Sequence, residues 1–163
     1  MYRGSRARRE SEIVHQESIR HLVDRYLSIS FFVTKRAATL VKSELDQDMT
    51  TDQFFLLRYI QRCGQCTSTQ LAAAFVVNKS AITAITNRLV DKGFLERKRD
   101  PRDRRLVYLE LSPAGKKWLA ATEEKIYKLV KKVITHFSQQ EIETFINTYE
   151  KLNHILREME EKA

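Results

Sequence analysis

The chain has 163 residues, of which 42% are hydrophobic and 31% are charged, so it is long enough to bury one core or two small ones. Only 4 glycines and 2 prolines are present, which favours a mainly helical fold with few turns. The formal net charge of +8 favours a polyanionic partner, nucleic acid before an anionic membrane. There is no apolar run long enough to span a membrane and no apolar signal core, so we expect a cytoplasmic protein.

The N-terminal region predicts a basic arm followed by one long helix. Residues 1–10 hold four arginines and almost no apolar side chain, and we expect a flexible arm with at most weak electrostatic contact to DNA. Within residues 11–48, apolar side chains from Ile19 to Leu45 recur at helical spacing. This segment is therefore predicted to be a single helix, and we assign it to dimerisation below.

Two capping boxes open the helices that follow. Thr50 with Gln53, and Thr67 with Gln70, have the spacing at which a hydroxyl and an amide side chain satisfy helix N-terminal amides. The first helix is predicted to stop at Gly64, and the second is short and ends near residue 75.

A further helix begins after Asn78, which is a good N-cap, and ends at Gly93, where a residue free to adopt positive φ is favoured. Its apolar positions Ile82, Ile85 and Leu89 recur at helical spacing. The opposite face carries small or hydrogen-bonding side chains: Lys79, Ser80, Thr83, Ala84 and Asn87. Such a face suits base edges in a DNA major groove, although an ordinary surface helix has polar residues there too.

Residues 94–111 predict a β-hairpin, because two apolar or alternating runs flank a break that contains Pro101. From Arg97 to Arg105 there are six basic residues and two aspartates, a local net charge of +4. Arginines suit a narrow, electronegative minor groove. A helix for one groove and a basic hairpin for the next is the winged helix-turn-helix arrangement.

The stretch from Thr67 to Gly115 resembles the DNA-binding lobe of MarR-type (multiple antibiotic resistance regulator) transcription factors. The string Asp-Pro-x-Asp-x-Arg, followed by Leu-Ser-x-x-Gly at a helix start, is the most specific part of this resemblance. The matching segments are Gln70-Leu71-Ala72, Ser80-Ala81-Ile82-Thr83, Asn87 to Arg97, Asp100 to Arg105 and Leu111-Ser112-Pro113-Ala114-Gly115.

The resemblance also implies roles for the wing. It assigns Arg105 to the minor groove and Asp103 to orienting that arginine, which leaves Arg102 and Arg104 as phosphate contacts. On the preceding helix we expect Ser80, Thr83 and Asn87 at base edges and Lys79, Arg88 and Lys92 at phosphates, with an intramolecular ion pair as the alternative for Arg88.

Two long helices are predicted in residues 113–163. Ser112 as N-cap with Pro113 at the first position starts one, and Ser138 with Glu141 forms a third capping box that starts the other. Apolar residues from Ile142 to Met159 step by three and four, the spacing of a coiled-coil seam. Because residues 49–112 supply their own core, these helices and that of residues 11–48 are predicted to pair with a second copy of the chain.

Cys63 and Cys66 are the one pair that could carry redox chemistry. No second cysteine pair completes a four-thiolate zinc site, and the histidines show no ligand spacing, so we expect no metal and no cofactor. We favour a structural role for both cysteines over oxidant sensing.

Aromatic side chains gather on the first two predicted helices. In the resembled family, small aromatic or anionic ligands bind between the dimerisation helices and the DNA-binding lobe, and Tyr26, Phe32, Phe55 and Tyr59 are candidates for such a pocket. Aromatic stripes are more often core, and we favour that interpretation.

The sequence thus predicts a mainly α protein with a small β-hairpin wing, and not an enzyme. Its divisions are a flexible arm (1–10), a dimerisation helix (11–48), a winged helix-turn-helix lobe (49–112) and C-terminal dimerisation helices (113–163). The expected function is a homodimeric, sequence-specific transcription regulator, a repressor, that binds a pseudo-palindromic operator in double-stranded DNA. Alternatives are a thiol-disulfide redox protein using Cys63 and Cys66, and a winged-helix module that docks protein or RNA.

Overall fold

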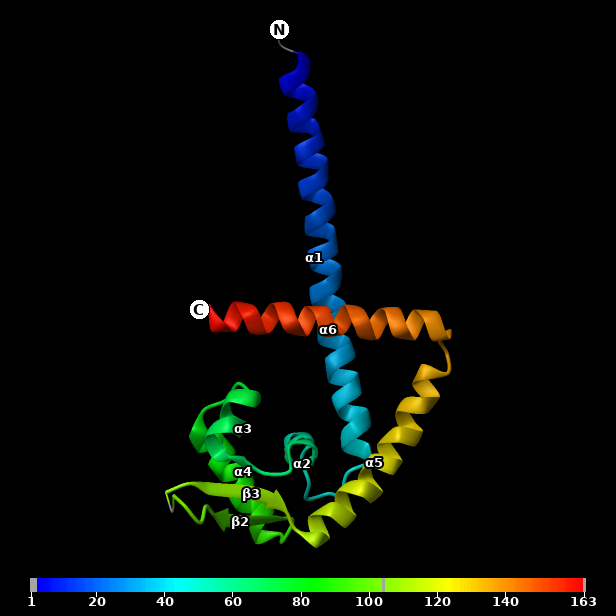
Figure 1. The fold of residues 1–163 in the computed structure, drawn as a ribbon. Coiled ribbons are helices and arrows are strands. Elements are labelled where there is room, and N and C mark those ends of the chain that lie inside the picture. The colour runs from blue at the N-terminus through cyan, green and yellow to red at the C-terminus, as the bar shows by residue number, and fades with distance from the viewer. Residues whose placement is uncertain (1–2, 104, 163) are drawn as a thin grey trace. The chain divides into compact units, whose positions relative to one another are not determined.

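The computed structural model describes residues 3–103 and 105–162, with side chains from residue 16 onward. In chain order the elements are α1 (Arg3–Ser43), α2 (Thr51–Cys63), β1 (Cys66–Thr67), α3 (Ser68–Ala74), α4 (Lys79–Asp91), β2 (Leu95–Arg99), β3 (Val107–Leu111), α5 (Pro113–Ile134) and α6 (Gln139–Glu161) (Figure 1). The predicted mainly helical class with a small β-hairpin is confirmed. Among the helices of the described residues, none combines the length and the apolar character that crossing a membrane requires.

The chain divides into two compact units, Met1–Thr51 and Asp52–Ala163. In the first unit α1 begins at Arg3, so the prediction of a flexible arm over residues 1–10 is wrong for the helical residues. Arginine, alanine and glutamate are good helix formers, and extending an existing helix gains one hydrogen bond per residue without a new nucleation cost.

From residue 16 to residue 40, α1 is exposed along almost its whole surface. Its large apolar side chains are each 44% to 59% exposed: Ile19, Leu22, Val23, Tyr26, Leu27, Ile29, Phe31, Phe32, Val33 and Leu40. The first unit by itself therefore does not bury the α1 aromatics, which were interpreted as core. Their helical spacing is confirmed, but spacing alone does not say which segment or chain covers the stripe.

The second unit has a closed core to which each element from α2 to α5 contributes. Its buried apolar side chains are Phe54, Leu56, Leu57, Ile60, Cys66, Leu71, Ile82, Leu89, Leu95, Leu109, Leu111 and Leu119. The sheet is antiparallel with strand order β1-β3-β2. In it Leu95 lies opposite Leu111 and Arg97 opposite Leu109.

Strand β1 was not predicted. It consists of Cys66 and Thr67, which pair with Leu109 and Tyr108 on β3. Two residues carry no alternation that a sequence pattern can report, and the pairing depends on β3, which lies about forty residues further along the chain.

Most of the predicted helix boundaries are confirmed. The capping boxes of Thr67 with Gln70 and of Ser138 with Glu141 are both formed. Asn78 caps α4, its side-chain oxygen accepting from the backbone amide of Ala81 at 2.8 Å. Gly64 and Gly93 follow α2 and α4 with φ of +79° and +73°, the left-handed region in which a residue without Cβ is favoured.

The C-terminal helices are only partly packed within the protomer. In α5 Leu119 is buried, whereas the apolar side chains near its end are exposed, and α6 has no buried residue. The exposed apolar side chains of α5, α6 and the turn between them are Tyr127, Val130, Val133, Ile134, Phe137, Phe145, Ile146, Tyr149, Ile155, Leu156 and Met159.

The start of α5 is held tightly against the end of α4. The backbone amide of Ser112 donates to the carbonyl of Phe94 at 3.1 Å, and the Ser112 hydroxyl donates to the carbonyl of Gly93 at 2.6 Å. Gly115 packs so closely that a Cβ placed on it would lie 2.1 Å from the Phe94 oxygen. We call these contacts the Phe94 junction.

We expect Gly115→Ala to destabilise the protein by about 1 to 3 kcal/mol, because the added methyl must displace a backbone carbonyl in a packed site. Urea unfolding followed by circular dichroism measures the change. Ala114→Ser is the matched control, since it adds one atom at the neighbouring exposed position. Equal unfolding midpoints for the two variants would contradict the close approach.

Candidate nucleic-acid interface

Helix α4 presents a polar outer face. Ile82, Thr86 and Leu89 are buried on its inner side, which packs against the rest of the second unit. The side chains predicted to contact DNA are all exposed along the outer side: Lys79, Ser80, Thr83, Asn87 and Arg88. The predicted phosphate contact Lys92 is the C-cap of the helix and is only half-exposed.

The two hydroxyls on this face use their hydrogens within the helix. Ser80 donates to the side-chain oxygen of Asn78 at 2.7 Å, and Thr83 donates to the carbonyl of Lys79 at 2.8 Å. A hydroxyl oxygen that donates its hydrogen keeps lone pairs that can accept. In this arrangement Ser80 and Thr83 offer acceptors to a partner.

Asn87 is joined to strand β2. The Nη2 of Arg97 donates to the side-chain oxygen Oδ1 of Asn87, and both residues are exposed. Helix α4 and β2 also pack directly on each other. The outer face of α4 and the hairpin are therefore parts of one surface.

The hairpin of β2, β3 and their connecting loop, which we call the wing, has an ordered tip. Oδ1 of Asp100 accepts from the backbone amides of Arg102 at 2.7 Å and Asp103 at 2.9 Å. Both hydrogen bonds lower the pKa of the Asp100 carboxyl, and the one from the Asp103 amide has the larger effect. An aspartate that accepts from amides two and three residues ahead stabilises a turn, so Asp100 shapes the loop that carries the arginines.

Asp103 contacts Arg105 through the backbone. Its Oδ1 accepts from the Arg105 amide at 3.0 Å, and its carbonyl accepts from the amide of Leu106 at 2.9 Å. The side chains of Arg102, Asp103 and Arg105 are exposed. Arg104, a predicted phosphate contact, lies outside the described residues. The predicted pairing of Asp103 with the Arg105 guanidinium stays a prediction.

The sequence did not single out Arg97 and Asp100 for these positions. Arg97 follows the buried Leu95 by two residues and so shares its face of the sheet, the face that packs on α4. Asp100 precedes Pro101 in the manner of a turn-forming aspartate. Both signals are local, but neither names the partner that the side chain contacts in the fold.

The two cysteines have different surroundings. Cys63 ends α2 and is exposed, whereas Cys66 lies on β1 and is buried, and both are free thiols. Burial, with a smaller contribution from nearby Cys63, raises the pKa of the Cys66 thiol to about 11. Burial also raises the pKa of Tyr59, and a hydrogen bond with Cys63 adds to the effect. A helix precedes the pair and a strand follows it, the reverse of the order expected for a thiol-disulfide oxidoreductase.

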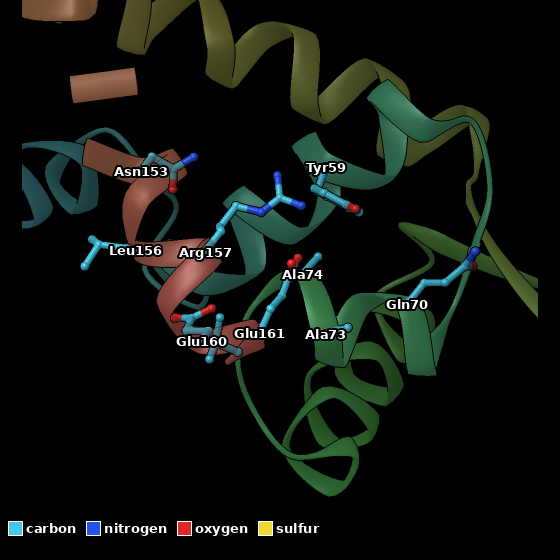
Figure 2. Close-up of a pocket in the computed structure, with 10 residues that line it drawn as sticks. Tyr59, Gln70, Ala73, Ala74, Asn153, Leu156, Arg157, Glu160 and Glu161 are labelled. Carbon is cyan, nitrogen blue, oxygen red and sulfur yellow. The ribbon is translucent and has the colours of Figure 1, made fainter. Parts of the chain in front are cut away.

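The four aromatic candidates for a ligand pocket are not brought together in the second unit. A cavity of about 770 Å³ opens between α2, α3 and α6, and of the four only Tyr59 lines it. Figure 2 shows Arg157 of α6 extending towards Tyr59, with the acidic side chains of Glu160 and Glu161 nearby. Phe55 is 41% exposed outside this cavity, and Tyr26 and Phe32 belong to α1.

Helices α3 and α4 joined by a short turn, followed by the basic wing, define a winged helix-turn-helix protein. The model of the MarR family matches residues 49–107. YpoP of Bacillus subtilis, an uncharacterized HTH-type transcriptional regulator, is 30% identical over 121 residues, which cover 74% of this chain and 86% of YpoP.

Solved structures have the same fold. A MepR-like protein complexed with pseudoligands matches with a TM-score of 0.60 and 30% identity, over 82% of this chain and 95% of that one. A mutant MarR of Escherichia coli complexed with operator DNA matches with a TM-score of 0.70 and 24% identity, over 78% of this chain and 92% of that one. The chain belongs to the MarR family, whose regulators are DNA-binding transcription factors and not enzymes.

We expect the Cys66 thiol to react slowly with iodoacetamide at pH 8 in a Cys63→Ser variant, because a pKa of about 11 leaves about one thiolate in a thousand. The rate of alkylation should keep rising up to about pH 11 in the folded protein, whereas in urea it should level off near pH 9. A folded-state rate that levels off near pH 9 would contradict the assigned burial.

The same shift in pKa affects stability. Because folding favours the protonated thiol, the contribution of Cys66 to the free energy of unfolding is present below pH 9 and is lost as the pH rises towards 11.

Proposed function

We propose that this protein is a sequence-specific transcriptional repressor that acts in the cytoplasm and binds a pseudo-palindromic operator as a homodimer. The observation that carries the proposal is the continuous surface made by the polar face of α4 and the basic wing, joined through Asn87 and Arg97. A helix of this kind fits a major groove, and an arginine-bearing hairpin fits the adjoining minor groove.

Within this proposal the contacts divide by chemistry. Ser80, Thr83 and Asn87 read base edges, because they are exposed on one side of α4 and carry hydrogen-bonding groups. Arg105 enters the minor groove from the wing tip, whose backbone Asp100 and Asp103 hold in place. The phosphate contacts, which fix register without reading sequence, are Lys79, Arg88, Arg102 and Arg104.

The exposed apolar side chains of the terminal helices support self-association. In the second unit they are numerous on α5 and α6, and α6 has no buried residue; in the first unit they line α1. Two-fold pairing of these helices would cover them and would place two reading surfaces on one duplex, with half-sites about one helical turn apart.

Release from DNA is proposed to follow binding of a small ligand or oxidation of a thiol. The cavity beside Tyr59 and Arg157 has room for a small molecule. Cys63 is exposed and within hydrogen-bonding reach of Tyr59, so it is the better placed of the two thiols to meet an oxidant. The alternative of a module that docks protein or RNA predicts binding without sequence preference in duplex DNA.

We expect Arg105→Ala to weaken binding to a duplex selected from random sequences by about 1 to 3 kcal/mol, because the variant loses a groove contact. Fluorescence anisotropy at fixed salt gives the affinity. Lys125→Ala on α5, which removes the same charge from an exposed site elsewhere, is the control and should change affinity little. Equal affinities for Arg105→Ala and the unsubstituted protein would remove Arg105 from the interface.

Phe145→Glu in α6 should convert the dimer to a monomer in analytical ultracentrifugation. The side chain is 54% exposed in the protomer, so the change leaves the protomer core intact while placing a charge in the proposed dimer contact. Lys151→Glu introduces the same residue at an exposed polar position of the same helix and should leave the dimer unchanged. A dimer that survives Phe145→Glu would place the contact elsewhere.

A further inference from the structure

The contact between Arg97 and Asn87 fixes which way the Asn87 amide faces. A guanidinium has only donors and no acceptor, so the atom of Asn87 that it meets must be the oxygen Oδ1. The nitrogen Nδ2, which carries two hydrogens, then points away from Arg97. Because the donor is charged, this hydrogen bond is stronger than one between neutral groups.

The strand places Arg97 where it can make this contact. It lies opposite the buried Leu109 and two residues from the buried Leu95, so its side chain leaves the sheet on the face that packs on α4. Lys98 and Glu110 leave the other face, where they form an ion pair of 2.6 Å. Arg97 therefore reaches α4 past the edge of the core.

We propose that Arg97 is a positioning residue that holds Asn87 as a hydrogen-bond donor and so sets which base this residue accepts. The inference deepens the proposed function and rests on it. A free asparagine pairs with adenine in the major groove by donating to N7 and accepting from N6, and this bidentate contact needs Oδ1. Arg97 engages one lone pair of Oδ1 and holds the amide with Nδ2 turned away from the guanidinium, so Nδ2 is the group that Asn87 presents to a base.

The consequence is a preference for bases whose major-groove edge is rich in acceptors. Guanine presents O6 and N7, and thymine presents O4, all of which can accept from Nδ2. Adenine can still accept from Nδ2 at N7, but Arg97 holds Oδ1 away from the geometry in which it also accepts from N6, so the bidentate contact is lost. We therefore assign a preference for guanine or thymine over adenine to the position that Asn87 faces in each half-site.

The test is selection of bound sequences from a library of random DNA duplexes, carried out in parallel for five forms of the full chain. These are the unsubstituted protein, Arg97→Met, Arg97→Lys, Asn87→Ala and Arg99→Met. The Arg97→Met variant removes the donor and keeps an aliphatic stem, whereas Arg97→Lys keeps charge and donors. Arg99→Met is the matched control, because Arg99 lies two residues along β2 on the same face and loses the same charge.

In the unsubstituted protein one position of the half-site should favour guanine or thymine over adenine, and Asn87→Ala should erase that preference. Arg97→Met should raise the acceptance of adenine at this position by about tenfold, roughly the value of a regained bidentate contact, and leave the other positions unchanged. Arg97→Lys should retain part of the preference. Arg99→Met removes one positive charge from the wing without touching Asn87, so any loss of affinity should be the same for every sequence.

Two results would overturn the inference while leaving the proposed function in place. One is an Arg97→Met profile with the unsubstituted preferences and a uniform loss of affinity like that of Arg99→Met, which would make Arg97 a phosphate contact. The other is an adenine preference in the unsubstituted protein at the position that Asn87→Ala affects. If no sequence is enriched by the unsubstituted protein, the proposed function fails and this inference fails with it.

Discussion

The Phe94 junction is the constraint on which the geometry of this protein depends. Ser112 donates from its backbone and from its side chain to two consecutive carbonyls, and Gly115 leaves space for one of them. These contacts lock the end of α4, the start of β2, the end of β3 and the start of α5 to one another. The Phe94 junction thereby sets the distance between α4, which is proposed to read the major groove, and the wing, which is proposed to read the minor groove. A regulator that must match two grooves at once needs this distance fixed before it meets DNA.

The wing combines high positive charge with a defined shape. A loop of like charges would repel itself and sample many conformations, but Asp100 and Asp103 accept backbone hydrogen bonds within the tip. The aspartates thus have two effects, since they lower the net charge of the tip and order its backbone. The arginines are then presented from a shaped loop and lose less conformational entropy on binding.

Local signals in the sequence were sufficient for most of the fold. Asn78, Thr67 and Ser138 cap helices because each side chain accepts from the amide three residues ahead, and Gly93 ends α4 because its backbone adopts positive φ. Interactions between distant segments could not be predicted, because they leave no periodic pattern in the sequence. Strand β1 exists only through pairing with β3, and the partner of Asn87 lies ten residues away on another element.

The exposed apolar stripe of α1 is a second example of a contact that the sequence pattern does not report. Periodicity identifies the apolar side chains of a helix that are stabilised by burial, but it does not say whether the same chain buries them. Phe54 of α2 is buried in the protomer, while Phe32 of α1, which belongs to an equally regular stripe, is 53% exposed. The candidate DNA-contacting residues on α4 and the described part of the wing were placed on the surface correctly, because polar side chains at helical spacing and a charged hairpin tip are local features.

We propose that two copies of this chain bind a single duplex together, each reading one half-site. The most direct measurement is the mass of the complex with a selected duplex, by sedimentation equilibrium. We expect two chains and one duplex across the whole range of protein concentrations at which sequence-specific binding occurs. A complex of one chain and one duplex that retains the full sequence preference would contradict it.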